Sequence, residues 1–237
     1  KDMDLKLRPG MITLTWTSMN IDAYKHHIHS GLQRLEELVT NINDLIENRI
    51  SKNLKTVSKC MLMDLNMSIV SLDTFVRKQE QHTETMSALL QGKNVEVENA
   101  VDDLIEIITT YPLDPQVLKD RAAADQEKDV QTLKRHYNNN MYQALLKATK
   151  NSLGVLKKRV GARNASNFMV EAKPFFEVDV GISAPSVLLE PSLDDVQRAI
   201  NKAAKAVLSF SHRLLEWGQR DVANDADKKT FFTRITK

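Results

Sequence analysis

The chain has 237 residues, 42% of them hydrophobic, and a formal net charge of +2; this is enough apolar content for a folded core and argues against disorder throughout. Seven glycines, six prolines and 5% aromatic residues are few for a sandwich, a barrel or a Rossmann fold, so helices are favoured. The single cysteine, Cys60, excludes an internal disulfide framework and fits a reducing compartment. Uncharged apolar runs stay short of the roughly 20 residues that span a bilayer. Because the chain begins at Lys1 without an initiator methionine or a signal-like segment, we interpret it as a fragment of a longer protein.

A short strand and a long helix are the first predicted elements. Over 11–17, apolar residues alternate with threonine, which is the period-two pattern of a half-buried strand. From Ile28 to Val57, apolar residues recur every three or four positions and predict a helix over about 20–58 with a heptad-like face. At the standard rise such a helix is about 50 Å long, a length that suits an elongated bundle.

The next region is predicted to form two helices, over about 71–91 and 94–111. Gly92 can end the first of them, and Asn94 can cap the second. Two prolines shortly after residue 111 stop the second helix, because proline cannot continue a helical hydrogen-bond ladder.

Polar residues complicate the pattern on either side of that region. Gln79 and His82 weaken the apolar stripe of the first of these two helices. The charged, alanine-rich segment 114–129 is either a mobile connection or the solvated start of the next helix. That helix is predicted over about 128–160, where the apolar spacing resumes.

The last predicted elements are a strand over 175–182 and a helix over 192–217. The strand pattern resembles that of 11–17, and we expect the two segments to pair across the end of the bundle. Ser192 is placed to cap the final helix, with two aspartates in its first turn, and Trp217 is expected to anchor the core. The predicted fold is therefore all-α: an elongated antiparallel helical bundle with long heptad-like helices and one or two short strands.

The charge distribution gives the one candidate contact surface. Residues 1–118 carry 12 basic and 17 acidic side chains, whereas residues 119–237 carry 21 and 14, and residues 130–170 contain no Asp or Glu. One reading is contact with an anionic surface such as tubulin, an acidic partner subunit or, less favourably, nucleic acid. The other reading is a solvated helix face that is offset by the acidic first half of the chain. The candidate partner-contact face comprises Lys147, Lys150, Lys157, Lys158, Arg159 and Arg163.

Motifs for catalysis are not found. A phosphate-binding G-x-x-x-x-G-K-[S/T] loop is missing, so we expect no nucleotide site in this chain. His26 and His29 could share a metal in principle, but without a neighbouring cysteine or carboxylate they read as a surface cluster with His27. The neighbours of Cys60 resemble core residues rather than the base and oxyanion donors that a nucleophile needs. We therefore expect no catalytic, cofactor-binding or metal-binding residue here.

Five sequence segments, in order along nearly the whole chain, resemble the N-terminal tail of axonemal dynein heavy chains. Their residues are most similar to the outer-arm type. The resemblance implies a piece of a rod of helical bundles, late in the tail and shortly before the linker, where heavy chains meet one another and bind intermediate and light chains. The segments are Arg8–Asp22, Ile42–Ile50, Tyr137–Leu145, Phe176–Val180 and Pro191–Asn201.

The same resemblance implies a function. It implies a structural tail segment that supports subunit assembly and transmits force in microtubule-based movement, in the cytoplasm and cytoskeleton, at the axoneme of a cilium or flagellum. The full-length parent is expected to be an ATP-hydrolysing microtubule motor, whose ATP and magnesium sites and microtubule-binding stalk lie outside this chain. Expected partners are other dynein heavy chains, intermediate and light chains and, through the complex, the doublet microtubule, without membrane or nucleic acid. The alternative is a basic helical module that binds an anionic surface, either tubulin or nucleic acid.

Overall fold

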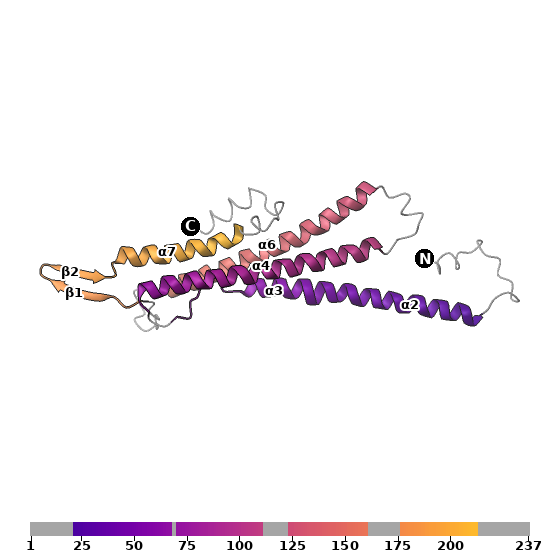
Figure 1. Cartoon of the computed structure of the whole chain (residues 1–237), viewed down its shortest axis with the longest axis horizontal. Coiled ribbons are helices and arrows are strands. Elements are labelled where there is room, and N and C mark those ends of the chain that lie inside the picture. The colour runs from indigo at the N-terminus through magenta and orange to yellow at the C-terminus, as the bar shows by residue number, and fades with distance from the viewer. Residues whose placement is uncertain (1–20, 68–69, 111–122, 161–175, 213–237) are drawn as a thin grey trace. The chain divides into compact units, whose positions relative to one another are not determined.

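The described residues are mostly helical. The computed structural model describes residues 21–67, 70–110, 123–160 and 176–212, and the strands among them form one antiparallel hairpin (Figure 1). The all-α prediction is therefore confirmed. By their internal contacts the residues divide into two compact units, 1–52 with 96–134 and 53–95 with 135–237. The predicted strand over 11–17, Arg163 and Trp217 lie outside the described residues.

In the first unit, one long helical stretch changes its hydrogen bonding midway. Helix α2 (Ile21–Asn43) continues into the π-helix η1 (Asp44–Ser51), and α3 (Lys52–Lys59) extends the helix into the second unit. Leu45 and Ile50 of η1 are buried. Residues five apart point to different sides of an α-helix, whereas the i→i+5 bonding of a π-helix brings them toward one face. The wider turn thus lets both side chains enter the core.

The apolar face predicted along this stretch is only partly buried. Leu32, Leu35 and Val39 of α2 are 50%, 55% and 49% exposed, whereas burial is nearly complete at Ile50. The spacing identifies which residues share a face, but burial also requires an element on the other side.

The second long helix corrects a prediction. Helix α4 (Leu72–Thr110) is continuous, although we expected a break between Gly92 and Asn94. A glycine inside a helix costs only about 1 kcal/mol relative to alanine. Burial of an aliphatic side chain contributes roughly 1.5–3 kcal/mol, so the buried stripe on both sides of Gly92 outweighs the local signal. That stripe consists of Leu90, Val97, Ala100, Val101 and Leu104.

Helix α6 (Ala123–Val160) begins before the predicted residue 128, so the end of the charged, alanine-rich segment is helical.

In the first unit, α4 is joined to its neighbours by two ion pairs. Arg49 Nη1 lies 3.4 Å from Asp103 Oδ2, and Lys134 Nζ lies 2.9 Å from Asp102 Oδ1. All four side chains are about half exposed, so each pair is worth at most about 1 kcal/mol.

The second unit contains the larger buried core. It combines α4 up to Val95 and α6 from Arg135 with α7 (Leu193–Ser209) and the 3-10 turn η2 (Phe210–His212). The ring of Phe75 meets that of Phe176 edge-on, with centroids 4.9 Å apart. The apolar core of this unit includes Val57, Leu62, Met63, Leu65, Met67, Phe75, Leu90, Met141, Tyr142, Ala144, Leu145, Ala148, Leu156, Ala199, Ala203, Val207 and Phe210.

The strand predicted over 175–182 is part of a hairpin. Strand β1 (Asp179–Ser183) pairs in antiparallel fashion with β2 (Ser186–Glu190), while Phe176 makes an isolated parallel bridge with Val70. Strand β2 was not predicted. Because hairpin strands are joined locally by a two-residue turn, β1 has a partner next to it in sequence. The expected pairing with 11–17 involves residues outside the described ranges.

The start of α7 confirms the predicted cap. Ser192 has extended backbone angles, and its Oγ accepts a hydrogen bond from the Asp195 N–H at 3.2 Å. The α-helix ends at Ser209 and η2 at His212, and the remainder of the predicted helix over 192–217 lies outside the described residues.

Candidate partner-contact face

Four lysines of the candidate face lie exposed on α6. Lys147, Lys150, Lys157 and Lys158 all fall within about a third of the helix circumference at 3.6 residues per turn. The opposite side of α6 is buried in the second unit through Met141, Leu145, Ala148, Ser152 and Leu156. The packing of α6 therefore directs these four lysines, hereafter the lysine face, toward solvent.

The carboxylates that the structure describes do not pair with the lysine face. Among the described residues, none of the four lysines forms an ion pair. Acidic side chains of α4 pair elsewhere: Asp102 and Asp103 with Lys134 and Arg49, and Glu80 with Lys202. The lysine face thus keeps its positive charge available for an external anion, in addition to being solvated.

Arg159 behaves differently from the lysines. Its guanidinium donates to the backbone oxygen of Leu65 and, at 3.1 Å, to that of Met67. Desolvation lowers the pKa of Arg159, and the charge of Asp64 opposes this shift. Arg159 was predicted as a surface contact, but in the structure it holds a neighbouring segment of its own chain.

That segment, 60–67, is the first part of the non-helical connection between α3 and α4, and side chains from two helices bind its backbone. From α6, the Ser152 hydroxyl accepts from the Leu62 N–H at 2.8 Å, in addition to the contacts of Arg159. From α4, Gln79 binds the backbone of Asp64 in both directions: its amide nitrogen donates to the carbonyl at 2.7 Å, and its oxygen accepts from the N–H at 3.2 Å. The connecting segment 60–67 is therefore fixed to α4 and α6 by directional bonds as well as by apolar burial.

Two polar residues of α4 that we expected to weaken its apolar stripe bind the connecting segment 60–67 instead. Gln79 and His82 interrupt the apolar stripe of α4, yet Gln79 is 6% exposed and His82 Nε2 lies 2.8 Å from the backbone oxygen of Met61. A buried segment without secondary structure must find partners for its backbone groups outside a helix or sheet ladder. A polar residue within the apolar face of a helix is thus a sequence signal for a side chain that binds the backbone of a neighbouring segment.

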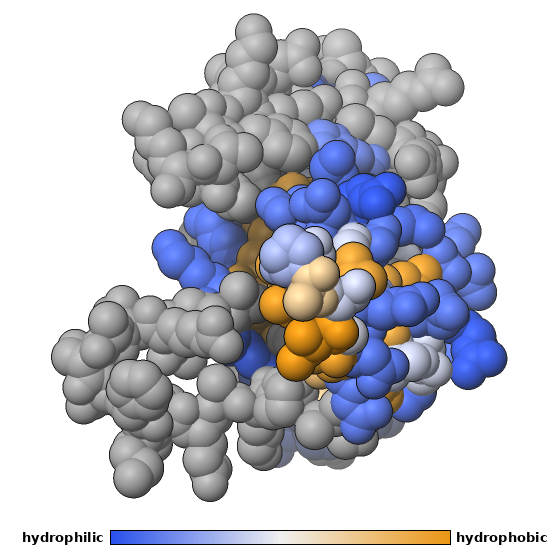
Figure 2. Space-filling model, turned by 90° about the vertical axis from the view of Figure 1, so that its left-hand side faces the viewer, coloured by the Kyte–Doolittle hydropathy of each residue, from blue (hydrophilic) through white to orange (hydrophobic). Residues whose placement is uncertain are grey.

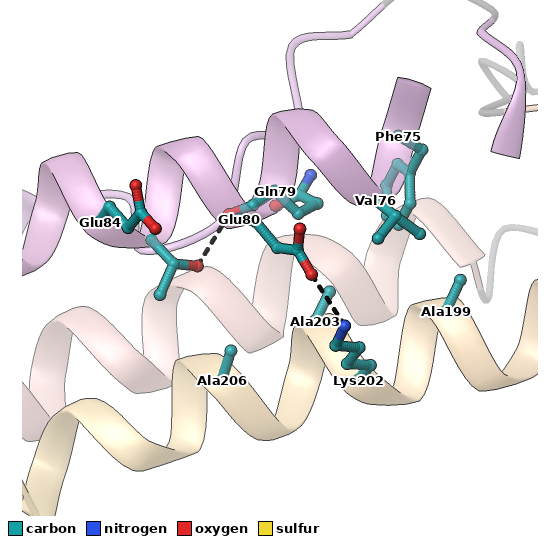
Figure 3. Close-up of a pocket in the computed structure, with 10 residues that line it drawn as sticks. Phe75, Val76, Gln79, Glu80, Glu84, Ala199, Lys202, Ala203 and Ala206 are labelled. Atoms are coloured by element: carbon teal, nitrogen blue, oxygen red, sulfur yellow. Dashed lines mark hydrogen bonds and ion pairs between the residues drawn. The ribbon is translucent and has the colours of Figure 1, made fainter. Parts of the chain in front are cut away.

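A small apolar slot lies between α4 and α7. Figure 3 shows Ala199, Ala203 and Ala206 of α7 facing α4, with the Lys202–Glu80 ion pair of 2.8 Å across the gap. The cavity measures about 190 Å³. Because the ionisable groups Lys202 and Glu80 at its edge neutralise each other, the slot favours apolar packing over acid–base chemistry.

Other sequence candidates lie apart from the lysine face. Cys60 is half-buried and donates to the backbone oxygen of Thr56 at 3.3 Å, and burial raises the pKa of its thiol, which disfavours the nucleophilic thiolate. His26, His27 and His29 lie on α2, and within the described ranges no three His, Cys, Asp or Glu side chains come together as a metal site would need. No helix among the described residues combines the length and apolarity that crossing a membrane requires.

Similarity to known proteins extends over almost the whole chain. The chain is 40% identical to the flagellar outer arm dynein gamma chain of Chlamydomonas reinhardtii over 225 residues, which is 94% of this chain and 5% of that protein. It is 25% identical over 268 aligned positions to dynein axonemal heavy chain 5 of Mus musculus, covering 91% of this chain and 6% of that protein. It is 24% identical over 264 aligned positions to dynein axonemal heavy chain 8 of Homo sapiens, covering 94% of this chain and 6% of that protein. No family model matches the chain.

These homologues are axonemal dynein heavy chains, and the resemblance found in the sequence is confirmed at that level. The chain spans 5–6% of the length of these curated relatives.

Proposed function

We propose that this chain is a structural segment in the tail of an axonemal dynein heavy chain of the outer-arm type. The observation that carries the proposal is the 40% identity to the flagellar outer arm gamma chain over 94% of the chain. On this proposal the protein acts at the axoneme of a cilium or flagellum, as part of the cytoskeleton, in microtubule-based movement. The whole parent chain would be the ATP-hydrolysing motor, while this segment supports assembly and transmits force.

The second unit has the properties that force transmission needs. Its helices are long, and the connection between α3 and α4 is bound through its backbone by Gln79, Ser152 and Arg159. Close-packed cores deform little under strain, and directional hydrogen bonds resist sliding of a connecting segment along its helices. A connection held in this way can pass load between α3 and α4 without local unfolding.

The lysine face is the contact that we propose for assembly. It fits an acidic surface of a neighbouring dynein subunit, either another heavy chain or an intermediate or light chain, and the doublet microtubule would be engaged through the complex. Partner binding is supported by four exposed lysines without ion pairs among the described residues, opposite a buried helix face. Electrostatic complementarity of this kind steers association and selects partners.

Charge reversal tests the contact. Replacing Lys150, Lys157 and Lys158 by Glu in the full heavy chain should reduce co-purification of the neighbouring subunit and weaken arm assembly. The matched control reverses three other exposed charges of the second unit through Arg77→Glu, Lys78→Glu and Lys205→Glu. Normal assembly of the lysine-face variant, or an equal loss in the control, would show that the face is only solvated.

The alternative function is a basic helical module that binds an anionic polymer, and the lysine face also motivates it. Such a module should bind microtubules or nucleic acid on its own, with an affinity that falls steeply with salt, for nucleic acid with a log–log slope of about −0.9 per phosphate neutralised. The tail proposal instead expects cross-links to other dynein subunits in intact axonemes and no nucleotide binding by this chain. Cross-linking in axonemes combined with salt titration on tubulin and duplex DNA distinguishes the two.

A further inference from the structure

The hairpin has one apolar face and one polar face. Its register places Val180 opposite Leu189 and Ile182 opposite Val187, and directly opposed side chains share a face of an antiparallel pair. The other face carries Asp179 opposite Glu190 and Ser183 opposite Ser186, with Gly181 opposite Leu188 between them. Four aliphatic side chains thus lie on a single face, hereafter the hairpin face: Val180, Ile182, Val187 and Leu189.

Within the described ranges, three of the four side chains of the hairpin face are uncovered, and Leu189 is half-buried. Ile182 is 83% exposed, Val187 64% and Val180 61%, although all three are β-branched residues typical of buried strands. Figure 2, which is turned so that the hairpin side of Figure 1 faces the viewer, shows a patch of apolar side chains. A lone two-stranded hairpin is marginally stable in water, and it becomes stable when its apolar face packs against another element. The hairpin therefore has the surface of an element that is completed by docking.

Charge restricts what can cover the hairpin face. Residues 176–195, which include the hairpin, contain five carboxylates and no Lys or Arg. The first basic residue that follows, Arg198, is already paired with Asp195 at 2.5 Å. Anionic lipid headgroups and nucleic-acid phosphates would be repelled by this acidic surround, whereas a protein surface bearing lysine or arginine would be attracted. The five carboxylates are Glu177, Asp179, Glu190, Asp194 and Asp195.

We infer that the hairpin face is a second docking surface, which binds a protein partner through an aliphatic strip bordered by Lys or Arg. The aliphatic strip covers the hairpin face, and the basic border meets Asp179 and Glu190 at its base. The surface has the opposite charge to the lysine face and lies on different elements, so the two surfaces select different partners. The inference does not rest on a role for the lysine face.

A photo-reactive residue tests it in the full-length protein within its native assembly. With the probe at Val187, the cross-linked peptide should contain aliphatic residues next to Lys or Arg. Ile182→Glu should abolish this cross-link, because it removes one buried aliphatic contact and places a charge in the apolar strip, which should lower the affinity by about tenfold or more. The matched control, Ser183→Glu, adds the same charge one residue away on the polar face and should preserve the cross-link.

Charge and salt provide a second readout that does not depend on apolar packing. The substitutions Asp179→Asn and Glu190→Gln, which neutralise the two carboxylates, should reduce both the cross-link and its sensitivity to salt. Charge reversal on the lysine face should leave the cross-link unchanged. No cross-link from Val187, a cross-link only to lipid or to the hairpin of a second copy, or equal losses with Ile182→Glu and Ser183→Glu would overturn the inference. Failure of the lysine-face experiment alone would leave it standing.

Discussion

The double hydrogen bond of Gln79 permits a quantitative test of how the connecting segment 60–67 is held. Gln79→Leu keeps the approximate volume of the side chain but removes both bonds to Asp64, which measure 2.7 and 3.2 Å. Each hydrogen bond contributes about 1 kcal/mol net. Because Asp64 is half-buried, water can hydrogen-bond to its released N–H and carbonyl groups and so prevent the larger cost of unsatisfied buried groups. We therefore expect the two lost bonds to destabilise the chain by about 2 kcal/mol in total.

The measurement is urea unfolding of the chain, followed by circular dichroism at the helix band. Gln81→Leu is the matched control: it makes the same change two residues away at an exposed position of the same helix, where we expect a change within about 0.5 kcal/mol. Gln79→Glu should destabilise at least as much as Gln79→Leu, because it loses the amide donor and places a carboxylate against the carbonyl oxygen of Asp64.

The result that would refute the reasoning is specific. If Gln79→Leu and Gln81→Leu changed the free energy of unfolding equally, the bonds of Gln79 to the segment would contribute nothing measurable. An increased stability of Gln79→Leu would show that apolar burial at this position outweighs the amide pair.

Three further predictions concern the second unit. Phe75→Ala should cost about 3–5 kcal/mol in urea unfolding, because Phe75 is 1% exposed and loses its edge contact with Phe176; a cost below about 1 kcal/mol would contradict this burial. Ser192→Ala should raise the pKa of Asp195 in an NMR titration, since the Ser192 hydroxyl is the main cause of its lowered pKa. The stability from that lowered pKa is present above the unfolded-state pKa and is lost as the pH falls through the folded value. An unshifted pKa in the variant would contradict the hydrogen bond that the Ser192 hydroxyl donates to Oδ2 of Asp195 at 2.6 Å. Burial raises the pKa of Cys60, so at neutral pH iodoacetamide should alkylate the folded chain more slowly than the urea-unfolded chain; equal rates would contradict it.

Local signals predicted the elements whose stability is local. The Ser192 cap and the three- and four-residue spacing that follows it predict the start of α7 correctly, because capping and amphipathicity act within one or two turns. The same kind of signal was wrong at Gly92, where burial of residues on both sides overrides a weak helix breaker. A local preference decides the structure only where tertiary packing does not oppose it.

The residues of the candidate face show the same difference between local and tertiary information. Sequence spacing grouped the lysines of α6 with Arg159, since all lie in a stretch without carboxylates. The structure separates Arg159 from them, because the bare backbone oxygens of Leu65 and Met67 lie within its reach. Which cation remains exposed thus depends on a segment more than 90 residues away in the chain.

By itself, the sequence determined the all-α class, the Ser192 cap, the basic stretch of α6 and the resemblance to axonemal dynein heavy chains, because each is expressed in residue types and short spacings. Tertiary structure decided which polar residues hold the connecting segment 60–67, that β1 pairs with β2, and that the described residues leave most of the aliphatic side of the hairpin uncovered. These outcomes depend on which backbone groups and apolar faces meet across the fold. Residue spacing within one element does not contain that information.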